Sequence, residues 1–318
     1  LEGVGFIVNP YDPCVANMMV DGHQLMVTWH VDDLKSSHID PDINESFINW
    51  LRMKYKDVNK VKATRGKIHN YLGMQINFSV EGKVKINMSR YVRDMLNSFD
   101  YKMELREKVK TPAAEHLFKI NKNAKKLDKG KAEVFHTTVA KGLFLCKRSR
   151  PDIQTTIAFL CTRVKDPDVD DWKKLLRLLN YLKDTIELET TLEADNTNIA
   201  KWYADAAFAV HPGMRSHTGG VMTLGKGAVQ TISTKQKINT KSSTEAELVG
   251  ADDVLSYVLW TKWFLEEQGY GMKDNILYQD NTSTMFLEKY GKESLSRRTR
   301  YINIKYFFIT DCIKREEL

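Results

Sequence analysis

The stretch that decides the fold begins Thr197-Asn-Ile-Ala-Lys-Trp-Tyr-Ala-Asp205 and continues to the end of the chain at residue 318. Short β-forming segments come first, and a long segment of helical periodicity begins at Ser243. The expected elements are strands at about 199–205, 219–225 and 228–234, a helix from Ser243 to Gly269, a strand at 275–279 and two further helices. This βββαβα order predicts a compact α/β domain over residues 197–318.

Three carboxylates in this stretch stand where the expected elements begin or end. Asp205 closes the first strand, Glu247 lies in the first turns of the long helix, and Asp280 follows the strand that contains Ile276-Leu277-Tyr278. Placed in this way, the three can converge on one edge of a sheet. Crowded carboxylates raise one another's pKa unless cations neutralise them, so the cluster predicts a hard-cation site. Two Mg²⁺ ions about 3.5–4 Å apart would suit phosphodiester hydrolysis.

Each carboxylate also has a structural interpretation. Asp205 could be an ordinary turn residue at the end of a strand, and Asp280-Asn281 could cap the helix that follows. Ser242-Ser-Thr-Glu245 fits a capping box, which makes Glu245 structural. Glu247 lies beyond the N3 position of a helix capped at Ser242 and is free to face the sheet. Of the two glutamates, Glu247 is therefore the predicted metal ligand.

The charge of the chain is concentrated in one block. The net charge is +7, yet residues 51–150 hold 25 Lys and Arg against 9 Asp and Glu, whereas residues 1–50 hold 1 against 8. Aromatic residues such as Tyr71 and Tyr91 are interleaved with the cations. Such a block is typical of a surface that follows a phosphate backbone, although a lysine-rich surface that only confers solubility has the same composition.

Composition excludes several classes of protein. Hydrophobic residues make up 42% of the 318 residues and charged residues 28%, so disordered, collagen-like and membrane classes fit poorly. No apolar run approaches the length of a bilayer span, and residues 1–20 lack the pattern of a signal peptide. The cysteines are single and scattered, which suits a reducing compartment. We therefore expect no membrane association, and a start at Leu1 without Met is expected for a fragment or a processed product.

The first 196 residues also mix strands and helices. Gln24 to Val31 predicts a strand, Asp32-Asp33 a tight turn, and Leu34 the start of a second strand. Helical spacing predicts a helix over 44–55, and alternation at 84–88 predicts a strand followed by a helix that Ser89 caps. Residues 119–131 are polar and lysine-rich and form the best linker candidate. Two further helices are expected, one opened by Pro151-Asp152 and one that carries Trp172, Leu175, Leu179 and Leu182.

The histidines carry no metal-site pattern. His30, His69, His136, His211 and His217 lie far apart in the sequence without ligand spacing, so none is predicted to bind a metal.

The motifs of the last 122 residues resemble the ribonuclease H domain of copia-type LTR retrotransposon Pol polyproteins. The resemblance is carried by Tyr203-Ala-Asp205-Ala, by Lys241-Ser-Ser-Thr-Glu-Ala-Glu247-Leu, and by Gln279-Asp280-Asn281. It implies that Asp205, Glu247 and Asp280 hold two Mg²⁺ ions, with Mn²⁺ as an alternative. The family has a His-Ile-Asp motif at the last helix, whereas this chain has Tyr301-Ile302-Asn303. Asn303 would be a weaker fourth ligand because one negative charge is lost.

The first half resembles the reverse transcriptase of the same Pol polyproteins. Trp29-His-Val-Asp32-Asp33-Leu34 is similar to the palm hairpin, so Asp32 and Asp33 would be a polymerase remnant. A polymerase needs a further metal-binding aspartate and fingers, both expected before Leu1, so no polymerase activity is expected from this chain alone. Other motifs of the family follow in order: Tyr71-Leu-Gly73, Ser89-Arg-Tyr91-Val, Thr111-Pro112, Arg150-Pro-Asp152-Ile and Leu179-Asn-Tyr181-Leu-Lys183.

The resemblance implies a three-part organisation and a set of partners. The expected regions are a truncated palm and thumb over 1–118, a helical connection over 119–196, and a ribonuclease H-like domain over 197–318, in an α/β (α+β) fold. The implied partners are an RNA/DNA hybrid, whose RNA strand would be hydrolysed, single-stranded nucleic acid, and the rest of the Pol polyprotein. The implied location is the cytoplasm, within a virus-like particle, or the nucleus.

Two alternatives belong to other classes of protein. Integrases and transposases place their glutamate last, on a C-terminal helix, whereas the order here is Asp205, Glu247, Asp280. A decayed or domesticated module that binds hybrid without cutting it would explain Tyr301 and Asn303.

Overall fold

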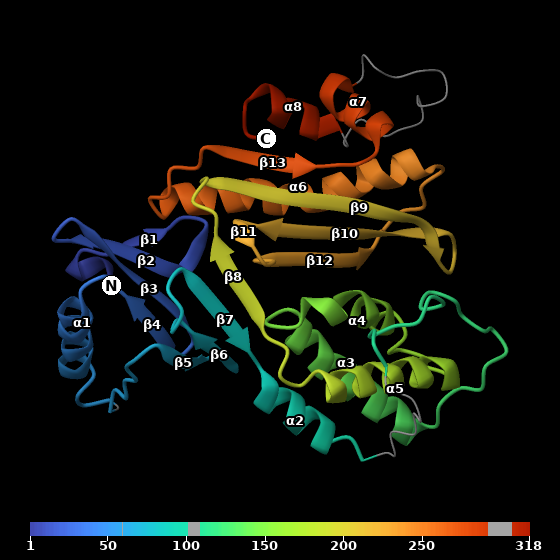
Figure 1. Cartoon of the computed structure of the whole chain (residues 1–318), viewed down its shortest axis with the longest axis horizontal. Coiled ribbons are helices and arrows are strands. Elements are labelled where there is room, and N and C mark those ends of the chain that lie inside the picture. Colours follow the sequence, from blue (N-terminus) through green and yellow to red (C-terminus); the bar gives the residue numbers. More distant parts are fainter. Residues whose placement is uncertain (59, 101–108, 292–306) are drawn as a thin grey trace.

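The described part of the chain folds into three sheets and a group of helices. The computed structural model describes residues 1–58, 60–100, 109–291 and 307–318. Figure 1 shows an N-terminal sheet at one end, a second sheet that runs through the middle, and a C-terminal sheet backed by a long helix. The described part is a mixed α/β structure, as the sequence predicts.

The C-terminal sheet has the strand order β12-β10-β9-β13. Its first three strands are antiparallel neighbours, and β13 pairs in parallel with β9. A parallel neighbour requires a crossover, which the long helix α6 provides. The bounds are β9 Ile199–His211, β10 Arg215–Thr223, β12 Gln230–Lys235, α6 Ser243–Glu267 and β13 Asp274–Tyr278, followed by α7 Thr282–Tyr290 and α8 Phe308–Lys314.

Helix α6 covers one face of this sheet, as Figure 1 shows. Alternate residues of β9 point toward it, and Trp202 is fully buried together with Val254 and Val258 of the helix. The helix can approach closely because Gly250 faces the strand, where a Cβ would lie 3.3 Å from the Cβ of Ala206. The other face of β9 carries Tyr203 and Asp205, which are exposed.

The N-terminal sheet has the order β1-β2-β3-β4 and packs against one helix. Phe47 of that helix is buried in the same core as Leu25 and Val27 of the sheet. This sheet also contacts α6, because the indole Nε1 of Trp260 donates to the carbonyl of Tyr11 over 2.9 Å. The elements are η1 Glu2–Val4, β1 Ile7–Asn9, β2 Asp12–Val20, β3 His23–His30, β4 Asp33–Ser37 and α1 Pro41–Lys54.

A five-stranded sheet in the order β11-β8-β7-β6-β5 joins distant parts of the sequence. Lys83 of β7 is paired with Glu193 of β8, and their side chains form an ion pair of 3.3 Å. The sheet thus contains strands from all three of the regions expected from the sequence, whose division stays a prediction. The bounds are β5 Ile68–Tyr71, β6 Met74–Asn77, β7 Lys83–Asn87, β8 Thr190–Ala194 and β11 Gly225–Lys226.

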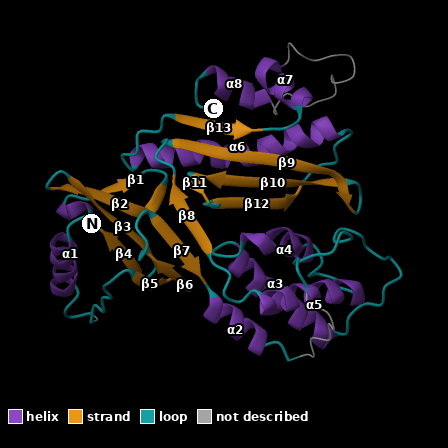
Figure 2. Cartoon of the chain, viewed as in Figure 1, coloured by secondary structure: helices purple, strands orange, loops and turns teal. Residues whose placement is uncertain are grey.

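The helices between these sheets share the largest core of the described chain. Figure 2 shows them gathered on one side of the molecule. Phe135, Ile157, Leu175 and Leu179 are fully buried in this core. Helix α4 also reaches β12, since the side-chain amide of Gln154 donates to the carbonyl of Thr231 over 3.1 Å. The elements are α2 Ser89–Asn97, α3 Lys129–Cys146, η2 Pro151–Ile153, α4 Gln154–Cys161 and α5 Val169–Asp184.

Two local expectations need correction. Ser89 is the first residue of α2 and does not cap it; the side chain of Asn87 accepts the backbone N–H of Ser89 over 2.7 Å. Strand β9 does not end at Asp205 but continues to His211, because β10 pairs with it as far as Arg215. Asp205 therefore lies inside a strand and is not a turn residue. Among the described helices, none has the length and apolar character that a bilayer span needs.

Candidate metal centre

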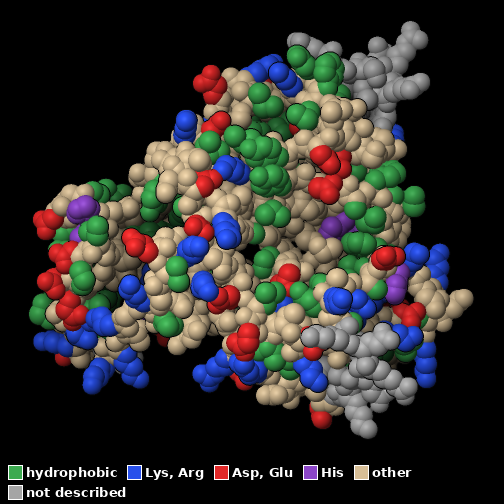
Figure 3. All heavy atoms as spheres, in the orientation of Figure 1, with side chains coloured by type: hydrophobic (Ala, Val, Ile, Leu, Met, Phe, Trp, Pro, Cys, Tyr) green, Lys and Arg blue, Asp and Glu red, His purple; other side chains and the backbone are tan. Residues whose placement is uncertain are grey.

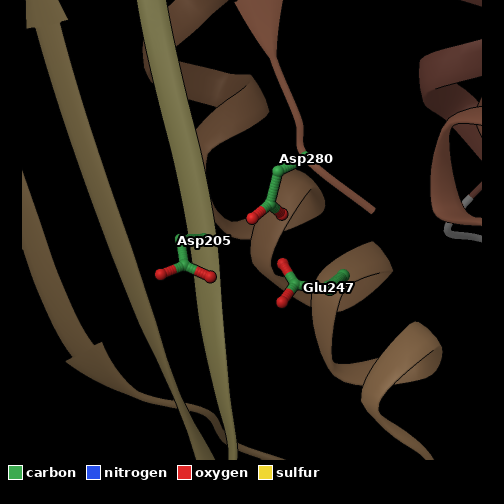
Figure 4. A group of neighbouring side chains, drawn as sticks. All are labelled: Asp205, Glu247 and Asp280. Carbon is green, nitrogen blue, oxygen red and sulfur yellow. The ribbon is translucent and has the colours of Figure 1, made fainter. Parts of the chain in front are cut away.

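Asp205, Glu247 and Asp280 converge on one side of the C-terminal sheet. Each offers a carboxylate oxygen, and these three oxygens lie within 4.8 Å of one another. Figure 4 shows the three side chains turned toward a common point, from β9, from α6 and from the segment after β13. The structure thus brings together the three residues that the sequence singles out.

The end of β13 creates the space for this cluster. Tyr278 is its last residue and lies opposite Tyr203 of β9, so Asp205 stands just beyond the point where the parallel pairing stops. Asp280 follows in the loop, and Asn281, not Asp280, caps α7 by accepting the N–H of Thr284 over 3.0 Å. The side chain of Asp280 therefore remains available to the cluster.

The first turn of α6 separates the roles of its two glutamates. The Ser242 hydroxyl accepts the N–H of Glu245 over 3.1 Å, and the Glu245 carboxylate accepts the N–H of Lys241 over 2.6 Å. Glu245 is thus held in the helix cap, as predicted, although its backbone partner is Lys241 and not Ser242. Glu247 is two residues further along the helix, and Gln279 donates to its carboxylate over 3.4 Å.

The electrostatics of the cluster suit a cation. Burial raises the pKa of Glu247 to about 7, and the charges of Asp205 and Asp280 add to this effect. None of the three carboxylates forms an ion pair with a Lys or Arg of the described residues. A divalent ion among these oxygens would remove the repulsion, and carboxylate oxygens are the ligands that Mg²⁺ prefers. The donor set therefore fits Mg²⁺, and Mn²⁺ as an alternative.

The predicted polymerase remnant, Asp32 and Asp33, does not join this cluster. Asp33 is the first residue of β4, and Asp32 lies in a two-residue turn with Val31, whose φ is 55°. This hairpin belongs to the N-terminal sheet, which Figure 1 shows apart from β9 and β13. Asn303 and its neighbour Tyr301 lie outside the described residues. Within the described chain, the triad is the one acidic group whose geometry suits a metal.

The basic block extends over several elements. Residues 51–150 run from the end of α1 through β5, β6, β7, α2 and α3. Figure 3 shows Lys and Arg side chains along the lower edge of the molecule, on the side of α1 and α2. The block is thus spread over several elements, and its Lys147 reaches the C-terminal sheet by donating to the Thr231 carbonyl of β12 over 3.4 Å.

Sequence reasoning missed Glu288, a buried carboxyl group near the site. Glu288 of α7 is 6% exposed, and its Oε1 has no hydrogen-bond partner among the described residues. Burial raises its pKa to about 8, and the charge of Glu247 contributes. Thr284, Leu287 and Glu288 share the helical face that is buried, and this i, i+3, i+4 spacing is the signal in the sequence.

We expect the Glu288 carboxyl to lower stability as the pH rises. Its folded pKa lies above its unfolded value, so its contribution to stability is present below about pH 4.5 and is lost as the pH rises through about 8. In EDTA, the free energy of unfolding from urea titrations should fall between pH 5 and pH 9, and Glu288→Gln should reduce that fall by on the order of 3 kcal/mol. Glu267→Gln, at an exposed position of α6, is the control. Equal pH dependence in both variants would contradict the assignment.

The structure also pairs two histidines that the sequence leaves apart. His211 and His217 lie on paired strands with 2.9 Å between Nε2 of the first and Nδ1 of the second, and His217 Nε2 lies 2.7 Å from the Ser233 hydroxyl. The antiparallel turn between β9 and β10 brings them together, and the ring of Phe118 packs against both. Burial lowers the pKa of each to about 4, so both are neutral at pH 7.

This pair should make the protein sensitive to acid. The folded pKa values lie below the unfolded value of 6.5, so the stability that the pair contributes is present above pH 6.5 and is lost toward pH 4. Between pH 7 and pH 5, His211→Phe should reduce the loss of unfolding free energy by about 2 kcal/mol, measured by urea denaturation. His136→Asn alters an exposed histidine and should leave the loss unchanged. If His211→Phe behaves as His136→Asn does, the pair is not the acid-sensitive element.

Comparisons with known proteins give relatives for nearly the whole chain. A retrovirus-related Pol polyprotein from transposon TNT 1-94 of Nicotiana tabacum is 27% identical over 320 residues, which cover 96% of this chain and 23% of that protein. The corresponding protein from transposon RE1 of Arabidopsis thaliana is 24% identical over 98% of this chain and 20% of its own length. A putative transposon Ty5-1 protein of Saccharomyces cerevisiae is 23% identical over 73% of each chain.

These similarities come from sequence alone. No protein-family model matches the chain, and no solved structure matches it. The chain spans less than a quarter of the length of the plant Pol polyproteins that it matches. The similarity nevertheless extends through both the N-terminal hairpin and the acidic triad. The chain is therefore related over nearly its whole length to retrotransposon Pol polyproteins, which confirms the resemblance that its motifs indicate.

Proposed function

We propose that this chain is part of a retroelement Pol protein and hydrolyses the RNA strand of an RNA/DNA hybrid. The observation that carries the proposal is the convergence of the Asp205, Glu247 and Asp280 oxygens within 4.8 Å. The three come from separate elements of one α/β sheet domain, and their order resembles that of ribonuclease H. The similarity to Pol polyproteins supports a role in retroelement nucleic-acid chemistry.

The three carboxylates would hold the ions from positions that differ in their exposure to solvent. Asp205 and Asp280 are exposed and face the solvent side of the site, whereas Glu247 is buried behind them and is fixed by α6. Two Mg²⁺ ions bound here would activate the attacking water and stabilise the leaving 3′ oxygen of the RNA. The backbone N–H of Ala206 and the amide of Gln279 orient the Glu247 carboxylate and favour its charged form.

The proposed partners are inferred from the positive charge of the chain and from the proposed hydrolysis of RNA. The basic block at 51–150 would hold the hybrid or a single strand through phosphate contacts, which position nucleic acid without reading its sequence. The rest of a Pol polyprotein is a further proposed partner, and the cytoplasmic virus-like particle or the nucleus is the proposed location. We do not assign polymerization to the Asp32-Asp33 hairpin, because no third carboxylate joins the two within the described chain.

A cleavage assay on a labelled hybrid tests the proposal. With Mg²⁺, the purified chain should shorten the RNA strand of an RNA/DNA hybrid and leave its DNA strand and a DNA duplex intact. EDTA should stop the reaction, and added Mg²⁺ should restore it. Tight binding of the hybrid without cutting in Mg²⁺ or Mn²⁺ would overturn the nuclease proposal and would favour a non-catalytic hybrid-binding module.

A further inference from the structure

Two tyrosines form a stacked pair directly beside the acidic triad. The rings of Tyr203 and Tyr278 have centroids 4.8 Å apart and an interplanar angle of 13°. The residues are 47% and 42% exposed, respectively, although aromatic side chains on a sheet are ordinarily covered. Figure 3 shows hydrophobic side chains gathered over β9 and β13 with acidic side chains beside them. The pair is thus an exposed platform next to the candidate metal centre.

The strand register fixes where the platform lies relative to the triad. Tyr203 and Tyr278 are direct partners in the parallel pairing of β9 with β13. Tyr203 is two residues before Asp205, and residues two apart on a strand share a face about 6.6 Å from each other. Tyr278 is likewise two residues before Asp280. A strand of nucleic acid that is cut at the triad and runs along β9 would therefore pass these rings.

The exposed face of β9 that carries Tyr203 and Asp205 also carries a cation. Lys201 is two residues before Tyr203 on β9, and its register partner on β13 is Ile276. Its ammonium group lies close enough to both phenols for their charges to affect its pKa, and it forms an ion pair with Asp195. Along β9 the exposed face therefore presents an ammonium group, the tyrosine platform and the carboxylates in sequence. This order complements the phosphate and sugar units of a strand that leads to the metal centre.

Part of this sheet face is already covered. Helix α4 lies against β12, where Gln154 donates to the Thr231 carbonyl and the Ser233 hydroxyl donates to Thr155 over 3.3 Å. His217 of β10 is buried on this face as well. The uncovered part includes the side of β9 and β13 that carries the tyrosines and the triad, together with the exposed Val221 of β10, the register partner of Tyr203.

The phenolic hydroxyls of the pair favour contacts with the sugars of a duplex. Each ring already covers one face of the other, so no base can insert between them. The pair presents ring edges, one outer face of each ring and two phenolic hydroxyls, for which no hydrogen bond to a described residue is found. The bases of a duplex are already stacked on one another, so its groove offers sugars and base edges to such a surface. A phenol both donates and accepts hydrogen bonds, as does the 2′-hydroxyl of a ribose. In an A-like helix the wide, shallow minor groove displays those 2′-hydroxyls.

We propose that Tyr203 and Tyr278 contact the riboses of the RNA strand next to the cut and select RNA over DNA through its 2′-hydroxyls. This inference rests on the proposed function, because it assumes that the RNA strand binds at the triad. It assigns a specificity role to two residues that bind no metal. Their part is to recognise the sugar, while the carboxylates hold the ions.

The test separates sugar recognition from cutting. We would measure the dissociation constants of an RNA/DNA hybrid and of a DNA duplex of the same sequence by fluorescence anisotropy, in EDTA so that nothing is cut. Tyr203→Phe with Tyr278→Phe keeps both rings and removes both hydroxyls. The preference of the wild-type chain for the hybrid should fall by about tenfold in this variant, the effect of losing two ordinary hydrogen bonds. Tyr257→Phe alters an exposed tyrosine of α6 and is the control.

The outcomes distinguish this inference from the proposed function. Loss of hybrid preference in the double Phe variant, with Tyr257→Phe unchanged, supports ribose recognition even if the wild-type chain cuts nothing. Equal preference in the double variant and the wild type overturns it, and so does a wild-type chain that binds both duplexes equally. A hybrid with 2′-O-methyl groups at the nucleotides beside the cut should bind the wild type as weakly as the DNA duplex does.

Discussion

Glu247→Gln should abolish cleavage of the RNA strand, with a rate reduction on the order of a thousandfold in Mg²⁺. The substitution keeps the shape of the side chain and removes the charge of the one buried carboxylate in the triad. Two exposed aspartates alone hold a pair of divalent ions less tightly, because ligand charge sets much of the affinity for hard cations. Gel analysis of a 5′-labelled hybrid measures the rate, and calorimetry measures the loss of Mg²⁺ uptake.

A matched control lies two residues earlier on the same helix. Glu245 is also buried, but its carboxylate accepts the Lys241 N–H in the helix cap, and a Gln carbonyl can accept the same hydrogen bond. Glu245→Gln should therefore keep cleavage within a few fold of the wild type and cost about 1 kcal/mol of stability. Similar losses of activity in both variants would show that the helix terminus, and not a ligand at Glu247, is what the reaction needs.

The thermal stability of the metal-free protein, measured in EDTA, tests the role of Glu247 independently of cleavage. Because its folded pKa is raised to about 7, Glu247 destabilises the metal-free protein as the pH rises through that value. Glu247→Gln should therefore melt at the same temperature as the wild type or above it at pH 8 without metal, while it loses activity. A variant that is inactive and also much less stable in EDTA would indicate a misfolded site.

The positions of the triad could be predicted because they follow from local periodicity. Alternation around Asp205, the capping box before Glu247 and the short apolar strand before Asp280 each mark an element of the sheet domain. A βββαβα order leaves few ways to arrange those elements, so the side on which the carboxylates meet is determined with little further information. The structure has β9, β10, β12, α6, β13 and α7 in that order, with the short β11 between β10 and β12 and α8 after α7, and it brings the three oxygens together.

What could not be predicted depends on contacts between distant residues. Strand β8 joins β7 from more than 100 positions away, and β11 is only two residues long, so neither pairing leaves a periodic signal. The His211–His217 contact arises from the register of β9 and β10, and a shift of one residue would turn one ring to the opposite face. Glu288 is marked in the sequence only by its helical spacing from Thr284 and Leu287, and its burial depends on how α7 packs.

Trp202→Ala should destabilise the chain by about 3–5 kcal/mol, the usual cost of truncating a fully buried tryptophan. Trp202 lies at the centre of β9 with no exposed surface, and it packs with Val254 and Val258 of α6. The close packing of β10 against α6 on the same face leaves little room for collapse, since a Cβ at Gly220 of β10 would lie 2.8 Å from Val254 Cγ1. The cavity would therefore persist, and the free energy of unfolding from urea titrations should show the loss.

Trp202→Phe distinguishes the effect of lost volume on stability from the effect of the unpaired indole N–H. The indole Nε1 is buried and has no hydrogen-bond partner among the described residues, so a phenyl ring removes an unsatisfied donor while it fills most of the volume. We expect Trp202→Phe to cost about 1–2 kcal/mol, less than half the cost of the alanine variant. Because the same strand carries Asp205 on its other face, Trp202→Ala should also weaken Mg²⁺ uptake at 25 °C, and Trp202→Phe should not. Unchanged stability in Trp202→Ala would mean that α6 does not pack on β9 as described, and the convergence of Glu247 with Asp205 would lose its structural basis.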